Sequence, residues 1–145
     1  MLLESAAAHR LCEYDLRALP RVLDELAVIR LVSPAQRSSD SVQVAQWDEA
    51  FHCTLVAAAG NAEMARVQRD VTERIRMIRR LDFTKLPRMD ATYREYGEIP
   101  EAIQRKRGDL AALLLRAHIQ TSQTEVRKIT LHQVHLARQM GGAAG

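Results

Sequence analysis

The chain has 145 residues, enough for one domain to bury a hydrophobic core without covalent staples. Hydrophobic residues make up 47% and charged residues 27%, but aromatic residues only 4%, so helix formers dominate and strand-type runs are missing. The net charge of +3 arises from interspersed acids and bases, which does not by itself indicate a nucleic-acid-binding protein. Taken together, these features predict an all-α domain.

Cysteine usage and hydropathy limit where the protein can work. No apolar run approaches the roughly 20 residues that a membrane-spanning helix needs, so no membrane contact is expected. The first residues also lack the pattern of a secretory signal peptide. Cys12 and Cys53 form no CxxC motif, and a reducing cytoplasm is therefore the expected location.

Four helices are predicted in the first half of the chain. Apolar residues at helical spacing predict helices over residues 2–13 and 15–32, followed by a polar loop over 33–39. A third helix is expected to begin near Asp40 or Ser41 and to end at Gly60, because glycine readily adopts the left-handed conformation that ends many helices. Asn61 can cap a fourth helix that continues to about Leu81.

Two further helices are predicted in the second half. A loop containing Pro87 precedes a helix over residues 90–106, in which Pro100 is expected to cause a kink or a break because proline lacks the backbone N–H. A helix stop at Gly108 is followed by a long last helix over residues 109–140. Short connections between long amphipathic helices imply an antiparallel bundle, with one domain over residues 1–140 and a disordered tail over 141–145.

Three residues form a candidate metal site. Asp48 and His52 are four residues apart, so they share one face of a helix, and carboxylate with imidazole can bind a divalent metal. The pair alone is a weak signal, and a solvated face with one hydrogen-bonded histidine explains it as well. His118 lies in a strongly apolar stretch, where it is either a core histidine with one partner or a third ligand that converges with the pair in the bundle core.

Catalytic interpretations of the same residues are weaker. Glu49 and His52 form the Glu-x-x-His element of di-iron bundles, but the required second copy is missing. A metal hydrolase could use His52 and His118 as ligands and Glu49 as base, yet Glu49 points about 100° away from Asp48 on the helix. No nucleophile constellation accompanies it, and we predict no catalytic residue and no enzymatic activity.

Short elements spread over nearly the whole chain resemble the FadR C-terminal (FCD) domain, the ligand-sensing half of many GntR-family transcription regulators. They are LESAA at residues 3–7, DxxFH at 48–52, AAGN at 58–61, EY at 95–96, AI at 102–103, GD at 108–109, Ala112 and HI at 118–119. Each element is loose by itself, but their order and spacing together are fairly specific.

The resemblance implies an antiparallel bundle of six to seven helices that binds an effector and forms a homodimer. In many members a central cavity holds a divalent metal on one aspartate and three histidines, and small carboxylates bind on or beside it. Effector occupancy is relayed to an N-terminal winged helix that binds operator DNA. Residues 1–140 would be the sensing domain, and operator DNA would be bound only through a winged-helix domain that is absent from this chain.

The metal ligands carry over at three of the four positions. Asp48, His52 and His118 match, and zinc, nickel or manganese would be the expected ion, whereas Tyr96 stands where the remaining histidine should be. A phenol binds metal only after losing a proton, which is costly at neutral pH. Two outcomes stay open: a metal on three protein ligands plus water or effector, or a metal-free site in which Tyr96 and the histidines bind the organic ligand directly.

A carboxylate effector also needs a positively charged partner. Arg76 and Arg79 are the candidates, because a guanidinium matches a carboxylate, although both could equally be solvated surface residues. The alternative to an effector sensor is a structural or interaction bundle whose metal and ligand site has decayed. A decayed site should have its four side chains scattered or its cavity filled by apolar groups.

Overall fold

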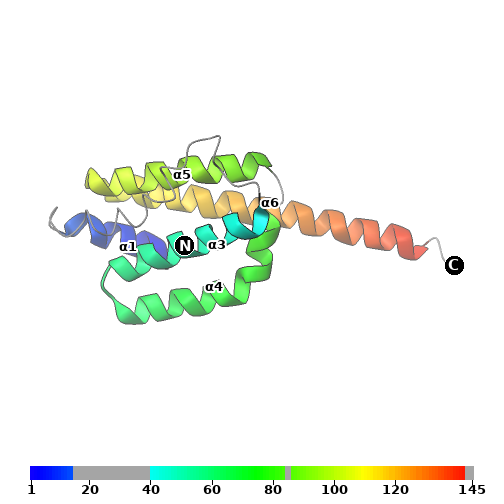
Figure 1. The fold of residues 1–145 in the computed structure, drawn as a ribbon, viewed down its shortest axis with the longest axis horizontal. Coiled ribbons are helices and arrows are strands. Elements are labelled where there is room, and N and C mark those ends of the chain that lie inside the picture. Colours follow the sequence, from blue (N-terminus) through cyan, green and yellow to red (C-terminus); the bar gives the residue numbers. More distant parts are fainter. Residues whose placement is uncertain (15–39, 84–85, 143–145) are drawn as a thin grey trace.

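The computed structural model describes residues 1–14, 40–83 and 86–142, and all regular elements within them are helices (Figure 1). They are α1 (Leu2–Glu13), α3 (Ser41–Ala58), α4 (Ala62–Asp82), α5 (Leu86–Gln104) and α6 (Gly108–Gly142). The all-α prediction is confirmed, with five helices described instead of six or seven. The helix predicted over residues 15–32 lies outside the described residues. None of the described helices is both long and apolar enough to cross a lipid bilayer.

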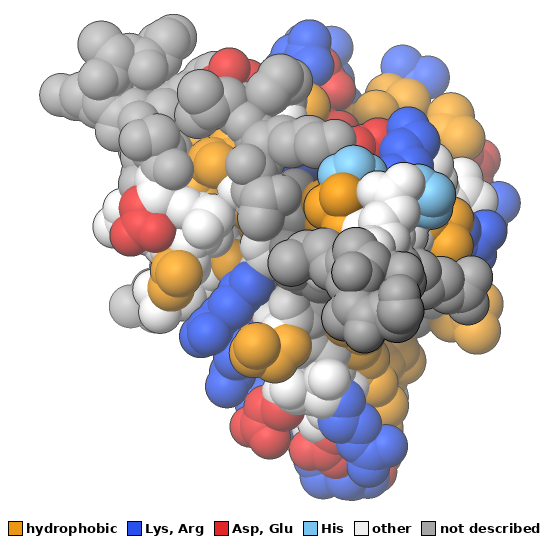
Figure 2. Space-filling view, turned by 90° about the vertical axis from the view of Figure 1, so that its right-hand side faces the viewer, with side chains coloured by type: hydrophobic (Ala, Val, Ile, Leu, Met, Phe, Trp, Pro, Cys, Tyr) orange, Lys and Arg blue, Asp and Glu red, His pale blue; other side chains and the backbone are white. Residues whose placement is uncertain are grey.

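The five helices pack against one another, and α6 contacts three of the other four extensively. It contacts α1, α4 and α5, while α3 lies between α1 and α4 (Figure 1). The C-terminal half of α6 extends well beyond the other helices. On the face seen from that end, acidic and basic side chains are mixed with hydrophobic ones (Figure 2). The site described below lies where α3, α4, α5 and α6 come together.

The helix ends around α3 follow the expected local chemistry. Asp40 caps α3 by accepting a hydrogen bond from the Val42 amide at 3.0 Å, and the Asn61 side chain accepts one from the Met64 amide at 3.0 Å. Gly60 has a φ of 77°, the left-handed conformation predicted for it. The Tyr14 hydroxyl donates to the Ala59 carbonyl at 2.6 Å, which ties the end of α1 to this turn.

Helix α5 corrects two expectations. It begins at Leu86, four residues earlier than predicted, so Pro87 lies in its first turn, where the missing N–H has no helical partner to lose. Of the kink or break expected at Pro100, the break is not found, because the helix continues to Gln104. The reason is tertiary packing: Pro100 is itself buried, and Ile99 and Ile103 are fully buried on either side of it. Burial of this apolar face outweighs the loss of one backbone hydrogen bond.

The end of α6 also differs from the prediction. The helix continues to Gly142, two residues into the stretch expected to be a disordered tail, and residues 143–145 lie outside the described part.

The hydrophobic core has two parts. The smaller one contains Val44, Ala45, Phe83, Met89 and Tyr93, and it lies at the N-terminal ends of α3 and α5. The larger one joins α1, α3, α5 and α6. At its centre Phe51 stacks on Tyr96 with ring centroids 4.6 Å apart, and both side chains are buried. This packed layer directly adjoins the polar residues of the site and holds their helices in place.

Candidate metal centre and adjoining cavity

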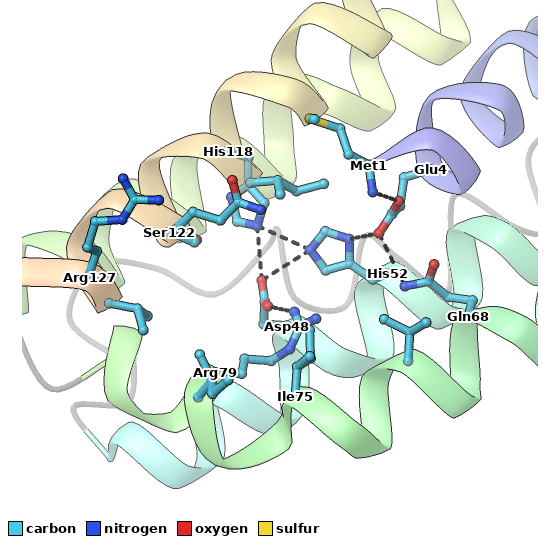
Figure 3. Close-up of a pocket in the computed structure, with 15 residues that line it drawn as sticks. Met1, Glu4, Asp48, His52, Gln68, Ile75, Arg79, His118, Ser122 and Arg127 are labelled. Atoms are coloured by element: carbon cyan, nitrogen blue, oxygen red, sulfur yellow. Dashed lines mark hydrogen bonds and ion pairs between the residues drawn. The ribbon is translucent and has the colours of Figure 1, made fainter. Parts of the chain in front are cut away.

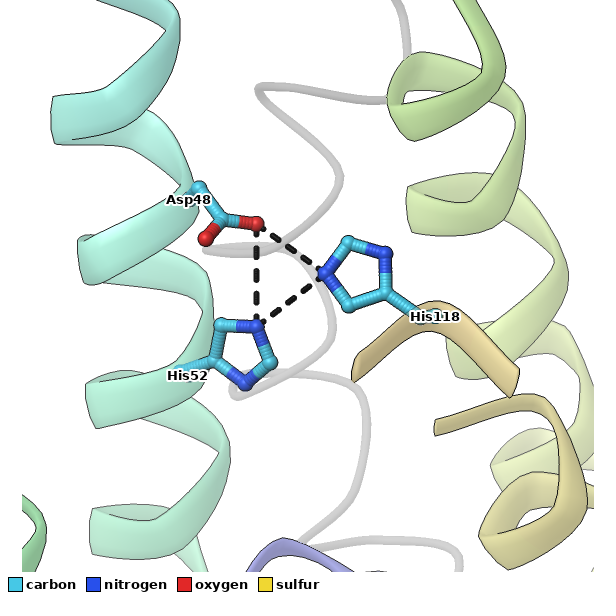
Figure 4. Close-up of side chains that lie close together, drawn as sticks. All are labelled: Asp48, His52 and His118. Carbon is cyan, nitrogen blue, oxygen red and sulfur yellow. Dashed lines mark hydrogen bonds and ion pairs between the residues drawn. The ribbon is translucent and has the colours of Figure 1, made fainter. Parts of the chain in front are cut away.

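The side chains of Asp48, His52 and His118, hereafter the triad, converge in the interior of the bundle (Figure 4). Asp48 and His52 project from successive turns of α3, and His118 faces them from α6. The Asp48 Oδ1 atom lies 3.1 Å from Nε2 of His118 and 3.6 Å from Nε2 of His52. The two Nε2 atoms are 3.2 Å apart. All three residues are at most 3% exposed, so water contributes little to solvating them.

The spacing of these three atoms fits a divalent transition metal. A tetrahedral ion with bonds of 2.0–2.1 Å separates its ligand atoms by about 3.3 Å. The triad distances of 3.1, 3.2 and 3.6 Å bracket that value. Two imidazole nitrogens and a carboxylate oxygen are also a donor set that zinc, nickel and manganese accept. The residues present could therefore hold such an ion.

Each histidine of the triad has a carboxylate near its other ring nitrogen. Nδ1 of His118 contacts a carboxylate oxygen of Glu95 from α5. Nδ1 of His52 faces Oε1 of Glu4 from α1 at 3.6 Å. A carboxylate at Nδ1 favours the tautomer with its proton there and leaves the Nε2 lone pair for a metal. Sequence reasoning missed this role of Glu4 and Glu95, although both stand in the elements that carry the family resemblance.

Further buried side chains anchor these two carboxylates. Arg88 on α5 is 4% exposed and donates to Glu95 at 3.2 Å and to Ser122 of α6 at 2.7 Å. The same guanidinium lies 3.2 Å from Nδ1 of His118. Gln68 on α4 donates to Glu4 at 3.2 Å. The orientation of the triad is thus fixed by contacts from every described helix.

Tyr96 acts as a hydrogen-bond donor to the triad. Its hydroxyl donates to Oδ1 of Asp48 at 2.7 Å. Burial and the nearby negative charge of Asp48 raise the pKa of Tyr96 well above its ordinary value, so the phenol keeps its proton. A neutral phenol is a poor metal ligand. Tyr96 therefore orients the carboxylate of Asp48, and the family's fourth ligand has no counterpart at this position.

Asp48 is ionised, and the positive charge of Arg79 balances its negative charge. Burial acts to raise the pKa of Asp48, but His52, His118 and Arg79 outweigh this effect and hold the pKa well below its ordinary value. Arg79 reaches from α4 and donates to Oδ2 of Asp48. Its Nε atom is buried and has no hydrogen-bond partner among the described residues. The Nε–H is thus unsatisfied, while the Arg79 side chain as a whole is 11% exposed.

The two histidines differ in how they hold a proton. Burial would lower the pKa of His118, but its hydrogen bonds to Asp48 and Glu95 raise it to about 9. For His52, burial dominates and lowers the pKa. Without a metal, His118 is thus the cation of the triad, and a metal ion would have to displace its proton.

A cavity of about 600 Å³ opens beside the triad (Figure 3). Asp48, His52 and His118 line one part of it together with Arg79 and Gln68. The rest lies between α4 and α6. The volume is in the range of small-molecule sites.

The second candidate arginine lies elsewhere. Arg76 does not line this cavity, and its Nε donates to a carboxylate oxygen of Glu49 at 3.1 Å, with Arg76 itself 47% exposed. Of the two arginines predicted to bind a carboxylate, only Arg79 is therefore positioned beside the triad. Glu49, the residue considered as a catalytic base, is engaged by Arg76 and not by the triad.

Comparison with known families agrees with the resemblance drawn from the sequence. The sequence profile of the FCD domain matches residues 1–121, which include the triad and Tyr96. No curated protein and no solved structure matches the chain. The profile match extends from α1 into α6 and covers most of the chain. The chain therefore belongs to the FCD domain family.

Proposed function

We propose that this chain is the effector-sensing and dimerisation domain of a GntR-type transcription regulator, and that a divalent metal on the triad helps it to bind a small carboxylate. Family membership supports the regulator part, since FCD domains belong to regulators and not to enzymes. In such a regulator a separate winged-helix domain binds operator DNA. A regulator of this kind works in the cytoplasm, which is the location that we propose.

One observation carries the metal part of the proposal. Two buried imidazoles and a buried carboxylate direct three ligand atoms at one point, at separations that match a metal's ligand shell. The carboxylate of Glu95 contacts Nδ1 of His118 in the way common for metal-bound histidines, and the carboxylate of Glu4 lies 3.6 Å from Nδ1 of His52. A bound divalent cation would supply positive charge for an effector carboxylate. Coordination positions beyond the three protein ligands would be left for water or the effector.

Arg79 is the protein group best suited to hold the effector. It lines the cavity, it is mostly buried, and its Nε–H has no partner among the described residues. A carboxylate beside the triad would pair with the guanidinium through a charge-assisted hydrogen bond. Because Arg79 also bonds Asp48, a ligand on the arginine would be sensed directly by the triad.

The two alternative functions receive less support. A decayed site should have scattered polar groups or an apolar filling, whereas here the triad and Tyr96 remain in mutual contact beside an open cavity. A hydrolase would need a base directed at the triad, but Glu49 is held by Arg76.

Elemental analysis of the purified protein tests the proposal. We expect close to one equivalent of zinc, nickel or manganese per chain, lost in Asp48→Ala and in His118→Ala. The matched control is His132→Ala, an exposed histidine on the same helix as His118, which should keep the metal. A native protein that stays metal-free after incubation with each of the three ions would refute the metal part. Light scattering should give the mass of a dimer, and a monomer at all concentrations would refute the dimerisation part.

A further inference from the structure

The cavity beside the triad is polar at the triad, and five aliphatic residues line its walls away from the triad, together with polar residues of α6. Away from the triad it is lined by Val71, Ile75 and Ile78 of α4 and by Ile119 and Val126 of α6. Residues 71, 75 and 78 follow helical spacing, as do 119 and 126, so each set occupies one face of its helix. Two helices thus present branched aliphatic side chains to one shared space.

Two of these five aliphatic side chains are exposed. Val71 is 43% exposed and Ile78 is 51% exposed, so they are not packed within the described core. Apolar surface left in water costs about 25 cal/mol per Å² relative to burial. A ligand with an apolar body would recover this free energy. A polyhydroxylated ligand would instead lose the hydrogen bonds of its hydroxyl groups against this wall.

The position of Arg79 defines the direction in which a ligand would lie. Arg79 and Ile75 are four residues apart and therefore share a face of α4. A carboxylate on the guanidinium of Arg79 would start beside the triad, and its body would continue over Ile75 and Ile78. Ser122, Gln123 and Arg127 of α6 also line the cavity, but of its two arginines Arg79 is the one that contacts the triad, whereas Arg127 lies away from it (Figure 3).

We infer that the effector is a medium-length aliphatic carboxylate, with its carboxylate at Arg79 and its hydrocarbon body along the α4–α6 wall, and not a sugar acid or a short hydroxy acid. This inference rests on the proposed carboxylate sensing and specifies its ligand class. The cavity of about 600 Å³ is larger than acetate or lactate needs and has room for a longer hydrocarbon body.

Calorimetric titration of the metal-loaded protein with straight-chain acids tests the inference. The probes are acetate, butyrate, hexanoate and octanoate, with gluconate as a hydroxylated acid of the same carbon number as hexanoate. Affinity should rise about fourfold for each added methylene, the equivalent of burying one CH₂ group, until the cavity is filled. Gluconate should bind more weakly than hexanoate.

Variants of the wall separate recognition of the chain from recognition of the carboxylate. Ile78→Ser should flatten the dependence on chain length and leave acetate binding nearly unchanged. The matched control is Met77→Ser, which alters a 70% exposed apolar residue of the same helix outside the cavity and should keep the full dependence. Because both residues are exposed, neither substitution is expected to disturb folding.

The outcomes distinguish this inference from the function on which it rests. If acetate and gluconate bind as tightly as octanoate, carboxylate sensing stands and the aliphatic class is overturned. If Ile78→Ser and Met77→Ser behave alike, the α4–α6 wall is not the binding surface and the inference fails. If none of the five acids binds, both the inference and the proposed carboxylate sensing are wrong, whatever the metal content.

Discussion

Replacing Glu95 by glutamine should weaken metal binding while the fold persists. The substitution keeps the size of the side chain and removes the negative charge that contacts Nδ1 of His118. The glutamine oxygen can still accept a hydrogen bond from Arg88, and Arg88 also keeps its bond to Ser122 at 2.7 Å. The substitution therefore tests how Glu95 affects the orientation and basicity of His118 as a metal ligand.

The size of the effect follows from the contacts of Glu95. Loss of a carboxylate that orients a metal-bound histidine typically costs 10- to 100-fold in metal affinity, or about 1.4–2.7 kcal/mol. Since the glutamine oxygen can replace part of the interaction, we expect the lower half of that range. The free energy of unfolding should fall by about 1–2 kcal/mol, because Glu95 is only partly buried and Arg88 keeps other acceptors.

Zinc competition against a chromophoric chelator measures the affinity, and urea unfolding measures the stability. Glu101→Gln is the matched control, since Glu101 lies on the same helix and forms an exposed pair with Arg105 at 2.7 Å. It should change neither quantity measurably. If Glu95→Gln binds zinc as tightly as the native protein, Glu95 does not orient His118, and our account of the carboxylates behind the triad is wrong.

Three other perturbations test the site and its frame. In metal-free protein the pKa of His118 is about 9 in the folded state, against 6.5 for the free group. The contribution of His118 to the free energy of unfolding should therefore be fully present below pH 6.5 and be lost as the pH rises to 9, and saturating zinc should reduce this loss. Urea unfolding that shows no such decline would contradict the proton assignment. Phe51→Ala should lower the free energy of unfolding by about 3–5 kcal/mol, because the ring is fully buried and stacked on Tyr96; a loss below 1 kcal/mol in urea would argue against this core. Gly60→Ala should cost about 1–2 kcal/mol, since φ is 77° and the new Cβ would lie 2.7 Å from the Tyr14 hydroxyl oxygen; an unchanged thermal midpoint would contradict the strained turn.

Local sequence signals predicted those features that depend on neighbours along the chain. Gly60 and Asn61 mark the turn between α3 and α4 because backbone conformation and capping are local properties. Asp48 and His52 could be paired because helical spacing alone puts them on one face. His118 could be linked to them only through its apolar surroundings and the family resemblance.

Features that depend on packing between helices could not be predicted. Arg76 and Arg79 are three residues apart on α4 and look equivalent in the sequence, yet one pairs with Glu49 at the surface and the other lines the cavity. Glu95 and Arg88 likewise resemble the solvated charges that most helices carry. Their roles arise only when α5 meets α6 and buries them against His118.

The most direct test of the central claim is X-ray diffraction from crystals of the zinc-loaded protein, recorded on both sides of the zinc absorption edge. Our account predicts one strong anomalous peak per chain within about 2.3 Å of Oδ1 of Asp48 and of Nε2 of both His52 and His118. An anomalous peak bound elsewhere, with the triad joined only by hydrogen bonds, would contradict the metal-assisted sensor.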